Sequence, residues 1–98
     1  MSDDFGGFAA PPFKAAEALA LLKRALRDLK LSERGNGFEL KGKRVVDLTL
    51  TESAIVVRIA RRLALTPEWD TQTLKSGTDQ RKCIDDIGKR LARWQHED

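Results

Sequence analysis

The chain has 98 residues, of which 41% are hydrophobic and 34% are charged, and its formal net charge is +3. This size and balance are typical of one soluble globular domain with a modest core. No apolar run approaches the ~18–20 residues that a membrane-spanning helix needs. The acidic residues 1–4 are not followed by an apolar segment, so no secretory signal is expected. A single cysteine, Cys83, excludes an intrachain disulfide and a cysteine-based zinc site, and it fits a cytoplasmic setting.

Residues 1–13 are predicted to be a flexible tail, followed by a single domain over residues 14–95 and a frayed end at residues 96–98. Glycines and a Pro-Pro pair in the tail disfavour both helix and sheet. Three of the six aromatic residues nevertheless lie in it, namely Phe5, Phe8 and Phe13. The alternative is that Phe8 or Phe13 binds an apolar groove, on this protein or on a partner.

A helix is predicted over residues 14–30. Alanines and leucines recur there at steps of three and four, while most charged residues fall on the other side. The sequence RGNG at residues 34–37 suits tight turning and follows the helix. Residues 38–41 (FELK) then alternate between apolar and polar, which is typical of a short strand.

The strongest pattern is a predicted hairpin over residues 45–59, with a turn at residues 51–54. One register pairs apolar residues with apolar residues on one face: Leu50 with Ile55, Leu48 with Val57 and Val46 with Ile59. The same register places Asp47 opposite Arg58 on the other face. A loop longer or shorter by one residue would lose both agreements.

Residues 55–65 also fit a helical stripe, which Thr51 or Ser53 could cap. A strand is favoured because β-branched residues lose rotamer freedom in a helix and suit a sheet. The four β-branched residues are Ile55, Val56, Val57 and Ile59. The helical alternative would give a helix-rich, winged-helix-like fold.

After a turn at residues 66–69, residues 70–74 are predicted to form a fourth, edge strand. The last helix opens at residues 76–79, where Ser76 or Thr78 can cap it, and Gly88 inside it is expected to allow close approach to the sheet. The predicted fold class is α+β: an N-terminal helix, a four-stranded antiparallel β-meander and a C-terminal helix. Both helices would cover one face of the sheet in a two-layer sandwich.

Side chains suited to catalysis are scarce, so the chain is predicted not to be an enzyme and to hold neither a cofactor nor a metal. The only histidine, His96, lies near the chain end, and one histidine with one cysteine cannot complete a typical metal site. Neighbouring helix residues point apart, so Asp85 and Asp86 are expected to pair with basic residues rather than to act together. Cys83 is interpreted as a small buried residue, although a nearby helix start could lower its pKa.

Five basic residues are predicted to gather at one end of the sheet. Extending the hairpin register puts Arg44 opposite Arg61 and Lys43 opposite Arg62, with Lys41 close by. Like charges directly opposed are unfavourable in a sheet, so a phosphate backbone or an acidic protein surface would relieve the repulsion. The alternative is that these side chains extend into water. No aromatic residue interleaves them, which argues against base stacking.

The outer face of the sheet is the second candidate surface. In the predicted register Val45 lies opposite Ala60 and beside Val56, which makes a small apolar strip framed by charged residues such as Arg58. With both helices on the inner face, nothing in the chain covers this strip. A strip of this kind can serve as a docking or dimer surface.

Several short motifs resemble a group of small uncharacterised bacterial proteins: LKR at 22–24, RDL at 27–29, FELKG at 38–42, TPEW at 66–69, TLKS at 73–76 and RLARW at 90–94. This resemblance spans most of the chain and implies no catalytic residues. Under the helical alternative, residues 38–40, 46–49 and 51–52 resemble the strand-then-helix entry of response-regulator winged-helix effector domains. Residues 81–87 would then stand where the DNA-reading helix does. The terminal wing hairpin of that family is missing, so this second resemblance is not adopted.

The sequence therefore predicts a non-enzymatic interaction module of a bacterial cytoplasm, which binds another protein or itself. The outer sheet face and the flanking basic cluster would form the binding surface. The alternative function is nucleic-acid binding through the five basic residues. Neither a membrane nor a metal is expected as a partner.

Overall fold

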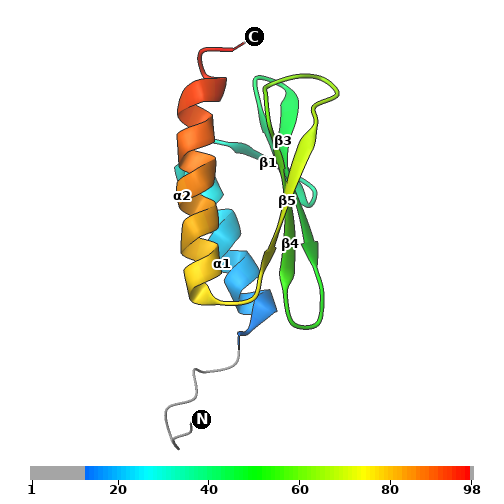
Figure 1. Ribbon diagram of the computed structural model, residues 1–98, viewed down its shortest axis with the longest axis vertical. Helices are drawn as coiled ribbons and strands as arrows, with labels where there is room; N and C mark the ends of the chain where they lie inside the picture. Colours follow the sequence, from blue (N-terminus) through cyan, green and yellow to red (C-terminus); the bar gives the residue numbers. More distant parts are fainter. Residues whose placement is uncertain (1–12, 98) are drawn as a thin grey trace, which may run out of the picture.

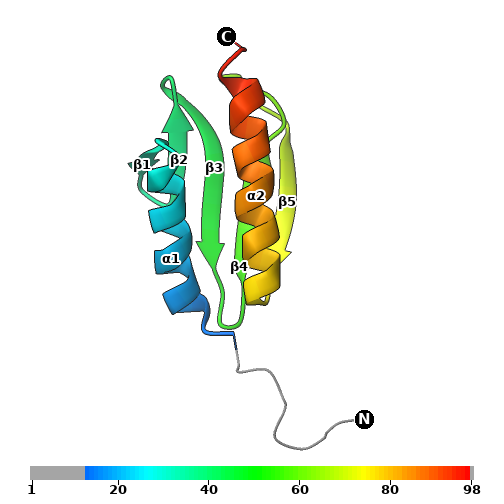
Figure 2. The same ribbon diagram turned by 90° about the vertical axis from the view of Figure 1, so that its left-hand side faces the viewer.

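The structure is a computed structural model, and it describes residues 13–97. The predicted tail lies outside the described residues, except for Phe13. The elements in chain order are α1 (Ala15–Asp28), β1 (Ser32–Arg34), β2 (Gly37–Leu40), β3 (Lys43–Leu50), β4 (Ile55–Ala60), β5 (Trp69–Leu74) and α2 (Gly77–Trp94). The strands form one antiparallel sheet in the order β1-β2-β3-β4-β5. Both helices lie on the same face of this sheet and run in the same direction (Figure 1, Figure 2).

This arrangement confirms the predicted α+β class, with a helix at each end of an antiparallel meander. The sheet has five strands rather than four, because Ser32–Arg34 pairs with β2. All three side chains of β1 are exposed, so the sequence carries no apolar alternation there that would predict a strand. No helix within residues 13–97 combines the length and the apolar character needed to cross a membrane.

The central hairpin has the predicted register. Val46 pairs with Ile59, Leu48 with Val57 and Leu50 with Ile55, and Asp47 lies opposite Arg58. Because residues 55–60 form a strand, the helical alternative and the winged-helix-like fold are wrong. The strand ends at Ala60 and does not continue to residue 65.

Ser76 caps the last helix, as the sequence allowed. Its hydroxyl accepts a hydrogen bond from the Asp79 amide at 3.1 Å, and the Asp79 carboxylate accepts one from the Lys75 amide at 2.9 Å. The expected role of Gly88 is wrong: a Cβ added there would meet nothing within 4 Å. Gly88 therefore does not mark a close contact between α2 and the sheet.

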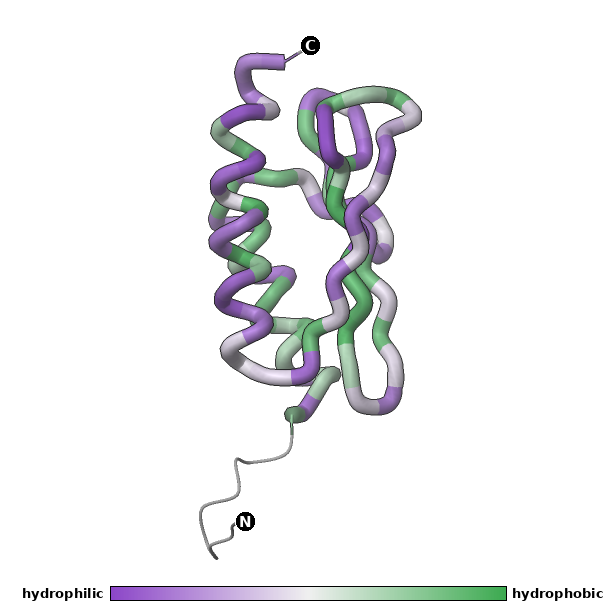
Figure 3. Tube along the Cα trace, viewed as in Figure 1, coloured by the Kyte–Doolittle hydropathy of each residue, from purple (hydrophilic) through white to green (hydrophobic). Residues whose placement is uncertain are grey.

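The core lies between the helices and the sheet. Trp94 and Phe38 are its largest fully buried side chains, and Phe13 packs against its edge. Apolar residues concentrate on the central strands, whereas α2 shows many hydrophilic turns (Figure 3). The helices thus bury one face of the sheet, and no element of residues 13–97 covers the other face (Figure 1).

Candidate functional site

The first candidate surface is the outer face, which we define as the side of the sheet that points away from α1 and α2. Paired residues on neighbouring strands share a face, and faces alternate along each strand. Val46, Leu48, Val57 and Ile59 are buried on the inner face. The outer face therefore carries two rows of paired residues, Asp47–Arg58–Thr71 and Thr49–Val56–Thr73.

A tryptophan and an arginine stack on this face. The Arg58 guanidinium lies 4.8 Å from the ring centroid of Trp69, within the range of a cation–π contact. Arg58 Nη1 also lies 3.9 Å from Asp47 Oδ2. Trp69 belongs to the predicted turn at residues 66–69, so its place on this face was not predicted. Extending the alternation of residues 70–74 backwards by one position would have placed it beside Arg58.

The predicted apolar strip on the outer face is wrong. Val45 and Ala60 are both fully buried. Phe38 pairs with Val46 and Glu39 pairs with Arg44, so Val45 is an extra residue in β3 at a β-bulge. Ala60 pairs with Trp69 in β5. Of the four residues predicted for this interaction face, only Val56, which is half-buried, and Arg58, which is exposed, remain accessible.

The bulge also changes the predicted basic cluster. The paired register of β3 and β4 ends at Val46 and Ile59, so Arg44 does not pair with Arg61 and Lys43 does not pair with Arg62. Arg44 pairs instead with Glu39 of β2. The like-charge repulsion expected from the sequence is therefore absent from this pairing.

Three of the five basic side chains contact groups of the protein itself. Arg44 forms an ion pair with Asp47 and donates to the Arg34 carbonyl at 3.2 Å. Arg61 forms ion pairs with Asp70 at 2.8 Å and with Glu68 at 3.5 Å. Lys41 Nζ donates to the carbonyl oxygens of Gln95 at 3.1 Å and Glu97 at 3.4 Å. Lys43 and Arg62 form no ion pair with another residue in the described part of the chain.

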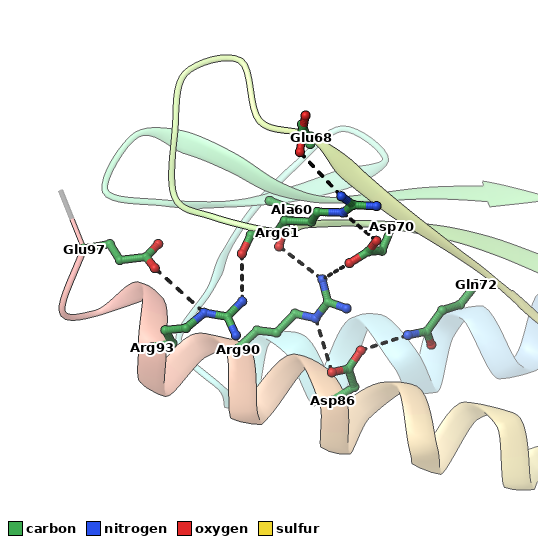
Figure 4. A network of polar contacts seen from close by, with 9 residues as sticks. All are labelled: Ala60, Arg61, Glu68, Asp70, Gln72, Asp86, Arg90, Arg93 and Glu97. Carbon is green, nitrogen blue, oxygen red and sulfur yellow. Dashed lines mark hydrogen bonds and ion pairs between the residues drawn. The ribbon is translucent and has the colours of Figure 1, made fainter.

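A polar network joins α2 to the end of the sheet, and Arg90 stands at its centre (Figure 4). Its side chain is 15% exposed and forms ion pairs with Asp70 at 2.8 Å and with Asp86 at 3.2 Å. It also donates to the Ala60 carbonyl at 3.3 Å. Gln72 of β5 donates to the second oxygen of Asp86 at 2.8 Å. These contacts hold one turn of α2 against β4 and β5.

The network shifts the pKa of Asp70, Arg61 and Arg90. Hydrogen bonds from Arg61, and then from Arg90, hold the pKa of the Asp70 carboxyl below its usual range. Desolvation works to lower the pKa of Arg90, but the hydrogen bonds to Asp86 and Asp70 outweigh it and raise that pKa. The Asp70 carboxyl therefore favours its charged, arginine-paired form. A carboxyl with a lowered pKa is poorly suited to exchange protons with a substrate near neutral pH.

A pocket of about 500 Å³ lies beside this network and is lined by Arg61, Asp70, Asp86, Lys89, Arg90 and Arg93. Its cations are matched by carboxylates: Lys89 pairs with Asp85 at 3.3 Å, and Arg93 lies 3.8 Å from Glu97. Such mutual pairing favours a structural role over the binding of a free anion.

Cys83 and the carboxylate pair behave as the sequence suggested. Cys83 is fully buried, and desolvation raises the pKa of its thiol to about 12, so a reactive thiolate is disfavoured. Asp85 pairs with Lys89, whereas Asp86 contacts Gln72 and Arg90. Within residues 13–97, no group of three or more His, Cys, Asp or Glu side chains is arranged to hold a metal ion.

No family model matches the chain, and neither a curated protein nor a solved structure is significantly similar to it.

Proposed function

We propose that this protein is a small non-enzymatic protein–protein interaction module that binds a protein surface through the outer face. The observation that carries the proposal is an uncovered sheet face with a stacked Trp69–Arg58 pair. Tryptophan and arginine are enriched among the residues that dominate binding energy at protein interfaces. Exposed threonines around the pair supply the polar rim that such interfaces share.

The charges of the outer face support a protein as the occupant. Arg34 lies 3.6 Å from Glu39, and Asp47 lies between Arg44 and Arg58. Positive and negative groups thus alternate across the strands. A mixed pattern complements another mixed protein surface, including a second copy of the same face, better than it complements a polyanion.

Site-specific photocrosslinking in cells tests this surface. A photoreactive amino acid at Thr71 on the outer face is expected to give a discrete protein adduct. The same amino acid at Arg24, on the exposed side of α1, is the control and should give none. An adduct with the mass of two chains would identify self-association, and light scattering of the purified protein would check it. No adduct at Thr71, or equal adducts at Thr71 and Arg24, would contradict the proposal.

Substitutions in the stacked pair separate binding from folding. Arg58→Glu reverses one charge on the outer face, and Trp69→Ala removes the aromatic ring. Both are expected to abolish the Thr71 adduct, because interface hot spots cost at least about 2 kcal/mol when truncated. Arg24→Glu should leave the adduct unchanged. Circular dichroism of each variant ensures that the loss does not come from unfolding.

Nucleic-acid binding through Lys41, Lys43, Arg44, Arg61 and Arg62 is the second candidate function. Its support is smaller, because only Lys43 and Arg62 lack an internal ion pair or carbonyl contact among the described residues. Binding to a phosphate backbone weakens steeply with salt. A low-salt titration with duplex and single-stranded oligonucleotides tests it, and no binding there would reject this candidate.

We also propose a bacterial, cytoplasmic setting, on the basis of the sequence resemblance and of a single buried thiol, which needs no oxidising compartment. Fractionation of cells that express the protein from its own gene tests the location. Recovery in a membrane or extracellular fraction would contradict it.

A further inference from the structure

A groove lies between the N-terminal ends of α1 and α2, on a different surface from the outer face. Its volume is about 570 Å³. Phe13, Ala18 and Leu21 give it an apolar side, and the link from β5 into α2 forms the opposite side through residues 75–78. Both helices begin at this end of the molecule, with the described chain starting beside them (Figure 1, Figure 2).

Leu21 is the unusual residue of the groove. It lies on α1 but outside the buried stripe of that helix, and it is 61% exposed. Exposed leucines are common singly. Here the exposed leucine and the half-buried Phe13 line the same groove together with Ala18, which gives the groove an apolar side. A segment that carries a large apolar side chain would bury it there.

The rim of the groove is positively charged. Lys14, Lys75 and Arg81 line it, against the single carboxylate of Glu17. Within residues 13–97, none of these three cations forms an ion pair. The first turn of α2 also presents the positive end of an 18-residue helix dipole, part of which the Asp79 carboxylate already offsets. An occupant that combines carboxylates with a bulky apolar group therefore fits this groove best.

The chain itself contains such a segment. Residues 1–12 run directly into Phe13, which lines the groove, and they hold Asp3, Asp4, Phe5 and Phe8. We propose that residues 1–12 dock into the groove of their own chain, with a phenylalanine against Leu21 and the two aspartates near Lys75 and Arg81. This proposal is independent of the proposed function.

The length of the segment is sufficient. An extended chain covers about 3.3–3.6 Å per residue, so the nine positions from Asp4 to Phe13 can span about 30 Å. A ten-residue helical stretch is about 15 Å long, which is more than the part of α1 from its start at Ala15 to Leu21. The reach of the segment therefore exceeds the length of the groove along α1. Glycines at positions 6 and 7 and prolines at positions 11 and 12 favour the turns that a returning segment needs.

Paramagnetic relaxation enhancement in the full-length chain tests the docking. A nitroxide label is attached to Ser2→Cys, and the buried Cys83, with its raised pKa, stays unlabelled. The wild-type protein treated with the same reagent gives the baseline. The amide signals of Leu21, Gly77 and Thr78 are expected to lose most of their intensity. The amide signals of Asp47 and Thr71 on the outer face should keep theirs.

Groove variants distinguish docking from simple tethering near Phe13. Leu21→Ser and the pair Lys75→Glu with Arg81→Glu are expected to restore most of the lost intensity. Lys82→Glu, a charge reversal outside the groove, should not. Adding Asp3→Lys and Asp4→Lys to the doubly reversed groove is expected to bring the broadening back.

Three results would overturn the proposal. The first is the absence of selective broadening at the groove. The second is broadening that is unchanged in both groove variants, because tethering alone would then explain it. The third is equal broadening when isotope-labelled protein without a nitroxide is mixed with unlabelled protein that carries one, because the segment would then dock on a second copy.

Discussion

Arg90 connects α2 to the sheet through two groups that lie far from it in the chain, and it also pairs with a carboxylate of its own helix. It contacts Asp70 of β5, Asp86 one turn earlier in α2, and the Ala60 carbonyl at the end of β4. The Arg90 side chain is 15% exposed and makes three such contacts. Its removal lowers the stability of the folded protein, because its partners are left with fewer donors.

Arg90→Met is therefore expected to lower the free energy of unfolding by about 2 kcal/mol. Lys89→Met is the matched control: the adjacent cation pairs with Asp85 in solvent, so its loss should change stability by no more than about 0.5 kcal/mol. Urea denaturation of the three proteins measures both values. Equal effects of the two substitutions would contradict the role assigned to Arg90.

Asp70 should make stability depend on pH. Its pKa is lowered in the folded state, so the stability it contributes is fully present above its unfolded pKa of about 3.9. That contribution is lost as the pH falls through the lower, folded-state pKa. We expect the stability difference between wild type and Asp70→Asn to shrink as the pH drops below about 3.9. Urea midpoints over a pH series measure it, and a difference independent of pH would refute this account.

At the scale of the elements, the β2–β3 hairpin depends on a glycine next to the bulge. A Cβ on Gly37 would clash with the Val46 carbonyl oxygen and with the Arg44 guanidinium. The Arg44 side chain could move, but the backbone of β3 could not without breaking its pairing. Arg44 therefore lies over Gly37, where it also reaches Asp47 and the Arg34 carbonyl.

Gly37→Ala is expected to destabilise the protein by about 2 kcal/mol, the usual cost of overpacking against a fixed backbone. Gly88→Ala provides the opposite case. A Cβ there meets nothing within 4 Å inside a helix, so the substitution should stabilise by about 0.5–1 kcal/mol. Thermal and urea unfolding of both variants test the pair, and a loss of stability in Gly88→Ala would show that α2 is packed more tightly than described.

At the scale of the whole molecule, the end of α2 fastens the loop between β4 and β5. Arg93 donates to the Arg61 carbonyl at 2.7 Å, and the Leu63 amide donates to Glu97 Oε1 at 2.9 Å. Residues 96 and 97 also continue in hydrogen-bonded turns, with the Glu97 amide 3.0 Å from the Trp94 carbonyl oxygen. Up to residue 97, the segment predicted to fray is thus hydrogen-bonded to α2, and through Glu97 it also contacts the distant loop between β4 and β5.

Glu97→Ala is expected to speed amide hydrogen exchange at Leu63 by about five- to tenfold, the equivalent of one hydrogen bond of about 1 kcal/mol. Glu97→Gln keeps an oxygen acceptor and should show a smaller increase. Exchange at Val57 in the central strand serves as the internal reference. Unchanged exchange at Leu63 in Glu97→Ala would mean that this contact does not hold the loop.

The sequence by itself determined both helices and the central hairpin with its register. These features depend on local spacing. Apolar residues repeat at the period of each element, and the short turn at residues 51–54 fixes the register of the hairpin. The tertiary structure alone decided the bulge at Val45, the pairing of Trp69 with Ala60 and the stack of Trp69 on Arg58. The bulge arises where β2 and β3 adjust to each other, and no residue pattern within β3 specifies it.

The same distinction explains the outcome for the basic residues. The sequence predicts five positive charges near one end of the sheet, but Lys41 contacts Gln95 and Arg61 contacts Asp70. Among the described residues, only Arg44 of these five has its partner, Asp47, close by in the chain. Ion pairs depend on which side chains the folded chain brings within a few ångströms, and no local period records that. Local patterning therefore fixed both helices and the central hairpin, whereas packing added β1 and decided which surfaces stay exposed.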